Sequence, residues 1–160
     1  MTIDAVVFSA INGLAGSSPA LDWIAVALTN FGIPVLALLV LLARNKKLAL
    51  KALVAVIAVL AIDAIINSIW FRPRPETAHL LVTASGSSFP STHAANSFAL
   101  AMLLFLHKKR RAFAIIAIVI ASRVSLSRIF AGVHWASDVV IGAAIGIGVA
   151  YGVEKLTARK

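Results

Sequence analysis

The sequence predicts an all-α protein: a polytopic membrane helix bundle of five to six helices that forms a single domain over residues 1–160. Hydrophobic residues make up 61% of the chain and charged residues 13%, whereas soluble domains average about 45–50% apolar residues. A soluble fold of this size would leave much of that apolar surface in water, so lipid must cover it. The absence of cysteine excludes thiolate chemistry, disulfides and cysteine-based zinc sites.

Five apolar segments are predicted to be membrane helices, at residues 20–43, 48–71, 93–107, 112–127 and 135–153. The first two are long enough to span a bilayer with some tilt. The third and fourth are short for lone spans and are predicted to pack inside the bundle. The fifth is rich in small residues, which let helix backbones approach closely. Residues 1–16, with Asp4 and Asn12, are predicted to form an interfacial or half-spanning helix.

The net charge of +9 is concentrated next to the apolar segments rather than spread over a surface. Eleven of the fifteen basic residues lie in three stretches, at residues 44–51, 108–111 and 155–160. Basic loops beside spans are typical of the cytoplasmic side of a membrane protein, where anionic headgroups attract them. This distribution argues against nucleic acid as a partner. It also places the loops at 72–92 and 128–134 together on the extracytoplasmic side.

The first of these loops opens with Phe-Arg-Pro-Arg-Pro-Glu at residues 71–76. Proline fixes the backbone and removes an amide donor, so Arg72 and Arg74 project from a stiff, non-helical segment. A guanidinium offers paired donors in one plane, which suits phosphate oxygens. A basic loop that holds lipid headgroups at the membrane edge is an equal interpretation of this stretch alone.

The same loop ends with Ser-Gly-Ser-Ser-Phe-Pro-Ser-Thr-His at residues 85–93. Ser91 and Thr92 stand where a helix is predicted to begin, and the free amides and dipole of a helix N-terminus attract anions. His93 lies beside that candidate anion site. Plain helix capping by Ser91 or Thr92 is the alternative, and it is compatible with anion binding.

The second loop continues from Ser127 into the last apolar segment and contains Arg128, His134 and Asp138. His134 and Asp138 are four residues apart, so on a helix they would share a face. A carboxylate bonded to one ring nitrogen fixes the tautomer and raises the basicity of the other nitrogen. This pair is therefore a candidate nucleophile or base, and a structural pair at a helix junction is the alternative.

Together these three stretches resemble the signature of the type 2 phosphatidic acid phosphatase superfamily. That signature is a lysine, six residues and Arg-Pro; then Pro-Ser-Gly-His; then Ser-Arg, five residues, His, three residues and Asp. The resemblance covers about residues 67–138, and the helical topology extends it over most of the chain. The matching residues here are Arg74, Pro75, Pro90, Ser91, His93, Ser127, Arg128, His134 and Asp138.

Two positions depart from that signature. Asn67 stands where the family has lysine, which removes one positive charge from the expected phosphate site, and Thr92 stands where the family has glycine. Arg72 is expected to compensate for the missing lysine.

The resemblance implies a two-step, metal-independent phosphate transfer with no cofactor. His134 would attack phosphorus with Asp138 orienting it, and His93 would act as general acid and then as general base. The phosphate-binding residues would be Arg74, Ser91, Thr92 and Arg128, with Arg72 and Asn67 as further candidates.

The expected substrate is a lipid phosphate or diphosphate, with undecaprenyl diphosphate first and phosphatidate or phosphatidylglycerol phosphate as the alternative. A membrane transporter and an inactive scaffold with the same fold are the competing classes. The expected location is the cell membrane, with the site on its extracytoplasmic side, and the sequence does not indicate an oligomeric state. Asp63 and Arg123 lie within predicted spans, where ionisable groups are costly, so a buried pair between them is the leading interpretation and a proton path the alternative.

Overall fold

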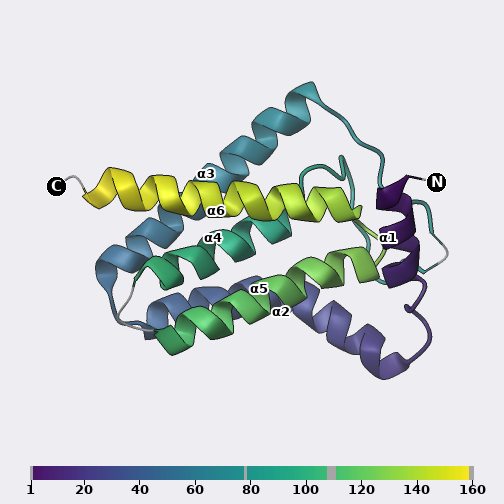
Figure 1. Ribbon diagram of the computed structural model, residues 1–160, viewed down its shortest axis with the longest axis horizontal. Helices are drawn as coiled ribbons and strands as arrows, with labels where there is room; N and C mark the ends of the chain where they lie inside the picture. Colours follow the sequence, from purple (N-terminus) through teal and green to yellow (C-terminus); the bar gives the residue numbers. More distant parts are fainter. Residues whose placement is uncertain (1, 78, 108–110, 159–160) are drawn as a thin grey trace.

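The computed structural model describes residues 2–77, 79–107 and 111–158, and within these ranges the regular structure is entirely helical (Figure 1). The described helices are α1 (Ile3–Asn12), α2 (Pro19–Leu42), α3 (Lys46–Ile69), α4 (Thr92–Leu106), α5 (Arg111–Phe130) and α6 (Ala136–Ala158). The predicted all-α membrane bundle is confirmed. Four helices, α2, α3, α5 and α6, are long and apolar enough to cross a membrane. The basic residues predicted to flank the spans at 108–110 and 159–160 lie outside the described residues.

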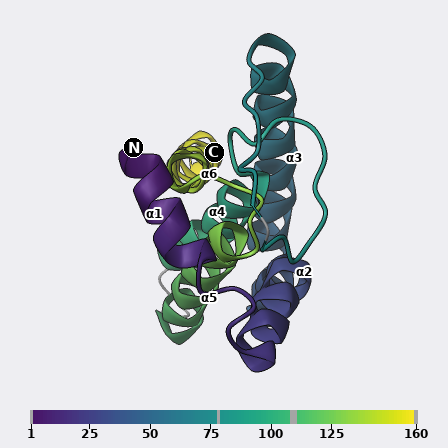
Figure 2. The same cartoon turned by 90° about the vertical axis from the view of Figure 1, so that its right-hand side faces the viewer.

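The short helix α4 lies at the centre of the bundle, where it packs against α2, α3, α5 and α6 (Figures 1 and 2). Most of its side chains between Ala94 and Leu104 are buried. Its neighbours carry the exposed apolar side chains instead, such as Phe31 on α2 and Ile57 on α3. Because other helices shield α4 from lipid, it does not need the length of a lone span.

The helix ends differ from the predicted ones where the site loops begin. Helix α3 ends at Ile69 rather than at residue 71, because the prolines at 73 and 75 cannot continue a helix and disfavour helical backbone before them. Helix α5 continues to Phe130, so Arg128 lies in its last turn rather than in a loop. Helix α6 begins at Ala136, so His134 precedes this helix and does not share a helical face with Asp138.

Helix α1 lies across the ends of α5 and α6 (Figures 1 and 2). Two of its polar residues, Asp4 and Asn12, contact other parts of the protein. Asn12 is 2% exposed, and its amide donates to the carbonyl oxygens of Phe130 at 2.8 Å and His79 at 3.0 Å. Helix α1 thus fastens the end of α5 to the loop that follows α3.

Helices α2 and α3 meet near the turn at residues 43–45 and diverge toward the end of the bundle where α1 lies (Figures 1 and 2). Their diverging halves leave α4 accessible between them, and the loop at 70–91 lies over this end. This divergence positions the cavity described below.

The contact between α4 and α6 depends on glycine in α6. A Cβ atom at Gly146 would lie 2.0 Å from the carbonyl oxygen of Ala95, and one at Gly142 would lie 2.5 Å from that of Ser91. Because these neighbours are backbone atoms, they cannot move aside as a side chain does. A Cβ at Gly148, in the same helix, would meet nothing within 4 Å.

Gly146→Ala should therefore destabilise the protein by about 1–3 kcal/mol, as expected for overpacking of a close helix contact, and Gly148→Ala should not. Thermal unfolding of the purified variants in one detergent would measure this difference. Equal melting temperatures for the two variants would contradict the close α4–α6 contact.

Candidate active site

Three stretches far apart in the sequence meet at the end of the bundle beside α1. They are the loop at 70–91, the last turn of α5 and the turn at 131–135 that leads into α6. Backbone hydrogen bonds join the loop to the other elements: Leu81 donates to the carbonyl of Ala131 in the turn at 3.1 Å, and Ser91 donates to that of Asp138 in α6 at 3.0 Å. The structure thus brings together the three motifs that the sequence analysis singled out.

A cavity of about 820 Å³ lies between these stretches and the diverging ends of α2 and α3. Its polar end is lined by Arg74, His93, Arg128 and His134. Away from this end the walls include apolar side chains of the spans, Ile33 of α2 and Leu60 of α3. The cavity therefore joins a cationic, histidine-bearing end to the membrane-spanning part of the bundle.

Arg128 is a buried cation at the polar end of this cavity. It is 5% exposed, and its Nε has no hydrogen-bond partner. Across residues 2–77, 79–107 and 111–158 no carboxylate pairs with it. A buried charge without a partner is costly, and a bound anion would offset that cost. Arg128 is therefore suited to bind an anion.

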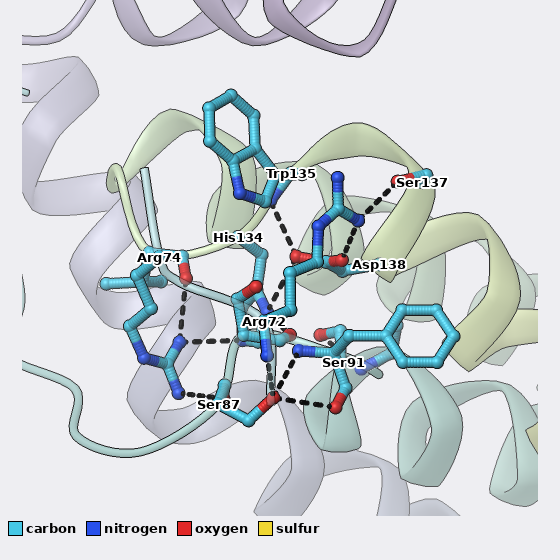
Figure 3. A network of polar contacts seen from close by, with 12 residues as sticks. Arg72, Arg74, Ser87, Ser91, His134, Trp135, Ser137 and Asp138 are labelled. Atoms are coloured by element: carbon cyan, nitrogen blue, oxygen red, sulfur yellow. Dashed lines mark hydrogen bonds and ion pairs between the residues drawn. The ribbon is translucent and has the colours of Figure 1, made fainter. Parts of the chain in front are cut away.

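Arg74 is held rigidly beside Arg128 and His134. Its Nη1 donates to the carbonyl of Val133 at 2.7 Å, and its Nη2 donates to those of Ser85 at 3.0 Å and Ser87 at 2.9 Å (Figure 3). Its Nε is buried and unpartnered. Burial lowers the pKa of the Arg74 guanidinium, and the carboxylates of Asp138 and Asp63 oppose that shift.

His134 is oriented by a backbone carbonyl. Its Nδ1 lies 2.7 Å from the carbonyl oxygen of Ser88, and its Nε2 lies 3.5 Å from Nη1 of Arg74. A carbonyl oxygen only accepts, so Nδ1 carries the proton and Nε2 keeps its lone pair. Burial lowers the pKa of His134 further than Asp138 raises it, which keeps the imidazole neutral at neutral pH.

The expected hydrogen bond between His134 and Asp138 is absent, because the Ser88 carbonyl takes its place. The Asp138 Oδ2 lies 3.8 Å from Nδ1 of His134, which is ion-pair distance and too long for a hydrogen bond. This oxygen accepts from the amide of Trp135 at 2.9 Å. The buried Asp138 carboxylate therefore acts on His134 through its charge.

The expectation that Arg72 replaces the missing lysine is wrong. Its Nη1 pairs with Oδ1 of Asp138 and donates to the hydroxyl of Ser137 at 2.7 Å, so it lies behind His134 and not in the cavity. Figure 3 shows Arg72 and Arg74 pointing in different directions. Their different settings agree with a proline-rich extended segment, in which there are about three residues per turn and residues two apart do not share a face.

The start of α4 supplies one wall of the polar end. Ser91 is fully buried, and its hydroxyl caps the helix by accepting from the amide of Ala94 at 3.4 Å. Thr92 and His93 line the cavity. The Thr92 hydroxyl donates to Oδ1 of Asp63 at 2.9 Å, so the side chain that replaces the family glycine is tied to α3.

Asn67 reaches the cavity but is also tied to Asp63, whose Oδ2 accepts from its amide at 3.0 Å. The predicted pairing of Asp63 with Arg123 is wrong, because Asp63 faces the cavity while Arg123 is exposed on α5. A carboxylate bonded to an amide thus stands near the position expected for a lysine.

Sequence reasoning missed two residues of this region. Asn96, one helical turn after His93, lines the cavity, is 6% exposed and has an unpartnered Oδ1. A signal was available, because an asparagine one turn from a candidate catalytic histidine falls on the same helix face. Asp4 of α1 contacts Arg72 and Ser137, and no spacing in the sequence indicates it.

Comparison with known proteins identifies the family to which this site belongs. A sequence model described as the PAP2 superfamily matches residues 48–160. The chain belongs to this superfamily. The PAP2 chain is 28% identical over 144 residues to undecaprenyl-diphosphatase BcrC of Bacillus subtilis. The aligned residues cover 84% of this chain and 74% of that protein. It is 38% identical over 98 residues to phosphatidylglycerophosphatase B of the same species, which covers 53% of this chain and 48% of that one.

Solved PAP2 structures share the fold over nearly the whole chain. The crystal structure of Aquifex aeolicus LpxE superposes with a TM-score of 0.83 at 26% identity, covering 97% of this chain and 96% of that one. A transmembrane PAP2-type phosphatidylglycerolphosphate phosphatase from Bacillus subtilis gives a TM-score of 0.79 at 26% identity, covering 98% and 85%. The predicted family and class are confirmed: the protein is a multi-pass membrane lipid phosphatase.

Proposed function

We propose that this PAP2 protein hydrolyses undecaprenyl diphosphate to undecaprenyl phosphate and inorganic phosphate, through a phosphohistidine on His134 and without a metal. The observation that carries the proposal is Arg128, a buried cation with no partner among the described residues, next to a rigidly held Arg74. Two such guanidiniums suit the oxygens of a terminal phosphate, where charge builds as the reaction proceeds.

The first step is attack of His134 Nε2 on the distal phosphorus. The hydrogen bond from Nδ1 to Ser88 leaves the Nε2 lone pair free, and the Asp138 charge stabilises the ring as its electrons form the P–N bond. The bond between phosphorus and the bridging oxygen breaks, and undecaprenyl phosphate leaves. His93, which also lines the cavity and is held protonated by the anionic phosphate bound beside it, donates a proton to the leaving oxygen.

The second step releases the phosphate. His93 takes a proton from water, the water oxygen attacks the phosphorus, and the P–N electron pair returns to Nε2 of His134. Arg74 and Arg128 hold the equatorial oxygens in both steps. The guanidiniums of Arg74 and Arg128 supply the positive charge, so the proposed mechanism requires no metal ion.

The shape of the cavity supports a substrate whose tail remains in lipid. The cavity extends from the polar end to Ile33 and Leu60, between helices that diverge. The similarity to undecaprenyl-diphosphatase BcrC, which extends over 84% of this chain, favours a polyprenyl diphosphate. The likeness in fold to a phosphatidylglycerolphosphate phosphatase makes phosphatidylglycerol phosphate the second candidate, with phosphatidate beside it.

The test is phosphate release by the purified protein from undecaprenyl diphosphate, phosphatidylglycerol phosphate and phosphatidate, with and without EDTA, and with His134→Ala as the blank. We expect release that is fastest from undecaprenyl diphosphate, unaffected by EDTA and absent from the variant. Faster release from either phosphoglycerolipid would replace the proposed substrate. Loss of activity in EDTA would overturn the metal-free mechanism.

We also propose that the site faces the extracytoplasmic side, on the basis of the basic loop between α2 and α3 at the other end of the bundle. Because the chain has no cysteine, single cysteines at Thr83 in the site loop and at Lys47 can be labelled in intact cells. A membrane-impermeant maleimide should label Thr83→Cys only; labelling of Lys47→Cys alone would reverse the orientation.

A further inference from the structure

Behind the His134–Asp138 pair lies a polar network that reaches the N-terminal helix. Asp4 of α1 accepts from Nη2 of Arg72 at 2.6 Å. Its carboxylate also accepts from the amide of Ser137 at 2.9 Å and from its hydroxyl at 2.6 Å. Arg72 in turn pairs with Asp138. An uninterrupted chain of contacts therefore runs from α1 through Arg72 to the carboxylate beside His134.

The apolar side of α1 supports the same region. Phe8 is buried and packs on Trp135 with ring centroids 5.2 Å apart. The Trp135 indole donates to the carbonyl of Pro73 at 3.0 Å, and the guanidinium carbon of Arg72 lies 5.7 Å from the centre of the tryptophan ring. Asp4 and Phe8 are four residues apart, so they share a face of α1 and contact this wall together.

The charges explain why Asp4 matters for His134. Asp138 is fully buried, and Arg72 is its one paired cation among the described residues. With Arg72 alone, the carboxylate would be neutralised and would do little for a cationic imidazole. Asp4 adds a second negative charge to the same guanidinium. Burial favours the neutral Asp4 acid, but the hydrogen bonds from Ser137 and Arg72 outweigh it and hold the pKa of Asp4 below its ordinary value.

We propose that Asp4 is a positioning residue for catalysis, which through Arg72 orients Asp138 and keeps its negative charge effective at His134. Asp4 lines no part of the cavity, so it acts on the nucleophile without touching the substrate. The inference rests on the proposed function of His134 as nucleophile. It assigns α1 a part in the chemistry as well as in the fold.

The kinetic test compares Asp4→Asn with wild type on the best lipid substrate. We expect kcat to fall about tenfold with KM nearly unchanged, the size expected when one unit charge is removed from a partly buried network. Asp4→Glu should restore most of the loss. Asp22→Asn is the matched control, because Asp22 is also a half-buried acidic residue near the N-terminus and, within the described part of the chain, its side chain bonds only the Gly16 amide.

A double variant separates positioning from general stability. In an Arg72→Gln background, Asp4→Asn should cost little more, because both substitutions break one chain of contacts. Independent losses, a change in KM alone, failure of Asp4→Glu to restore kcat, or an equal loss in Asp22→Asn would each overturn the proposal.

A substrate-free measurement keeps the inference testable if the proposed function fails. In protein labelled with ¹⁵N-histidine, the titration of His134 can be assigned with His134→Gln. The charged and titratable groups that act on His134 are Arg74 of the loop, Arg128 of α5, His93 of α4 and Asp138 of α6.

With Asp4 removed, the charge of Arg72 is opposed by Asp138 alone, so the imidazolium is less stable. Asp4→Asn should therefore shift the His134 titration to lower pH, and an unchanged titration would overturn the proposal. If no lipid released phosphate but Asp4→Asn still shifted the His134 titration, the proposed function would be rejected. The coupling of α1 to His134 would still hold.

Discussion

His134→Ala should lower kcat by at least about 10⁴-fold, because it removes the group that forms the covalent bond. His93→Ala should lower kcat by about 10²–10⁴-fold, the range of general acid–base catalysis. The two variants should differ in what accumulates. With a diphosphate substrate the leaving group is a phosphate, which departs more easily than an alkoxide, so loss of His93 should slow hydrolysis of the intermediate more than its formation.

Undecaprenyl diphosphate labelled with ³²P in the distal phosphate tests this difference. His93→Ala should retain protein-bound label that survives alkali and is lost in acid, as phosphohistidine is, and His134→Ala should retain none. Thermal unfolding of both variants provides the control for folding. Protein-bound label in His134→Ala would assign the nucleophile to another residue, and full activity of His93→Ala would remove it from the proton transfers.

Arg128→Met should lower kcat/KM by about 10²–10³-fold, as loss of one preorganised donor to a developing oxyanion does. It should not destabilise the ligand-free protein and is expected to stabilise it, because the Nε of the buried guanidinium is unpartnered and no carboxylate among the described residues pairs with it. Replacement of an unpaired buried charge by an apolar side chain removes its desolvation cost. Methionine also keeps much of the side-chain volume.

Arg123→Met is the matched control, because Arg123 lies on the same helix but is exposed. Its activity should be close to wild type. Melting temperatures with and without orthovanadate, an analogue of phosphate, complete the test. Vanadate should stabilise wild type and Arg123→Met but not Arg128→Met. A less stable Arg128→Met protein with normal activity would mean that Arg128 is structural.

Much of the candidate site follows from local properties of the chain. The apolar composition indicates a membrane bundle, and the spacings within 72–93 and 127–138 single out Arg74, His93, Arg128 and His134. The structure gathers these four residues at one end of one cavity. Local spacing can predict these residues because the reactive side chains of each motif lie within a few consecutive positions of the sequence.

The errors concern groups whose partners lie far away along the chain. Arg72 and Arg74 stand in the same proline-rich stretch, yet one pairs with Asp138 and the other faces the cavity. Asp63 was expected to pair with Arg123, but its partners are Asn67 and Thr92. Spacing cannot distinguish such partners, because the choice depends on which helices come together.

The sequence by itself determined the class of the protein, an all-α membrane phosphatase, and the residue types of its site. Only the tertiary structure decided what orients His134. The ring of His134 donates a hydrogen bond to the carbonyl of Ser88, which is 46 positions away in the sequence. The polar network behind His134 ends at Asp4, which is 68 positions from its partner Arg72. The sequence could not predict these partners, because every residue has a backbone carbonyl and nothing in the sequence indicates which one accepts a given hydrogen bond. An acidic residue on a short helix contacts the site only when that helix packs against it.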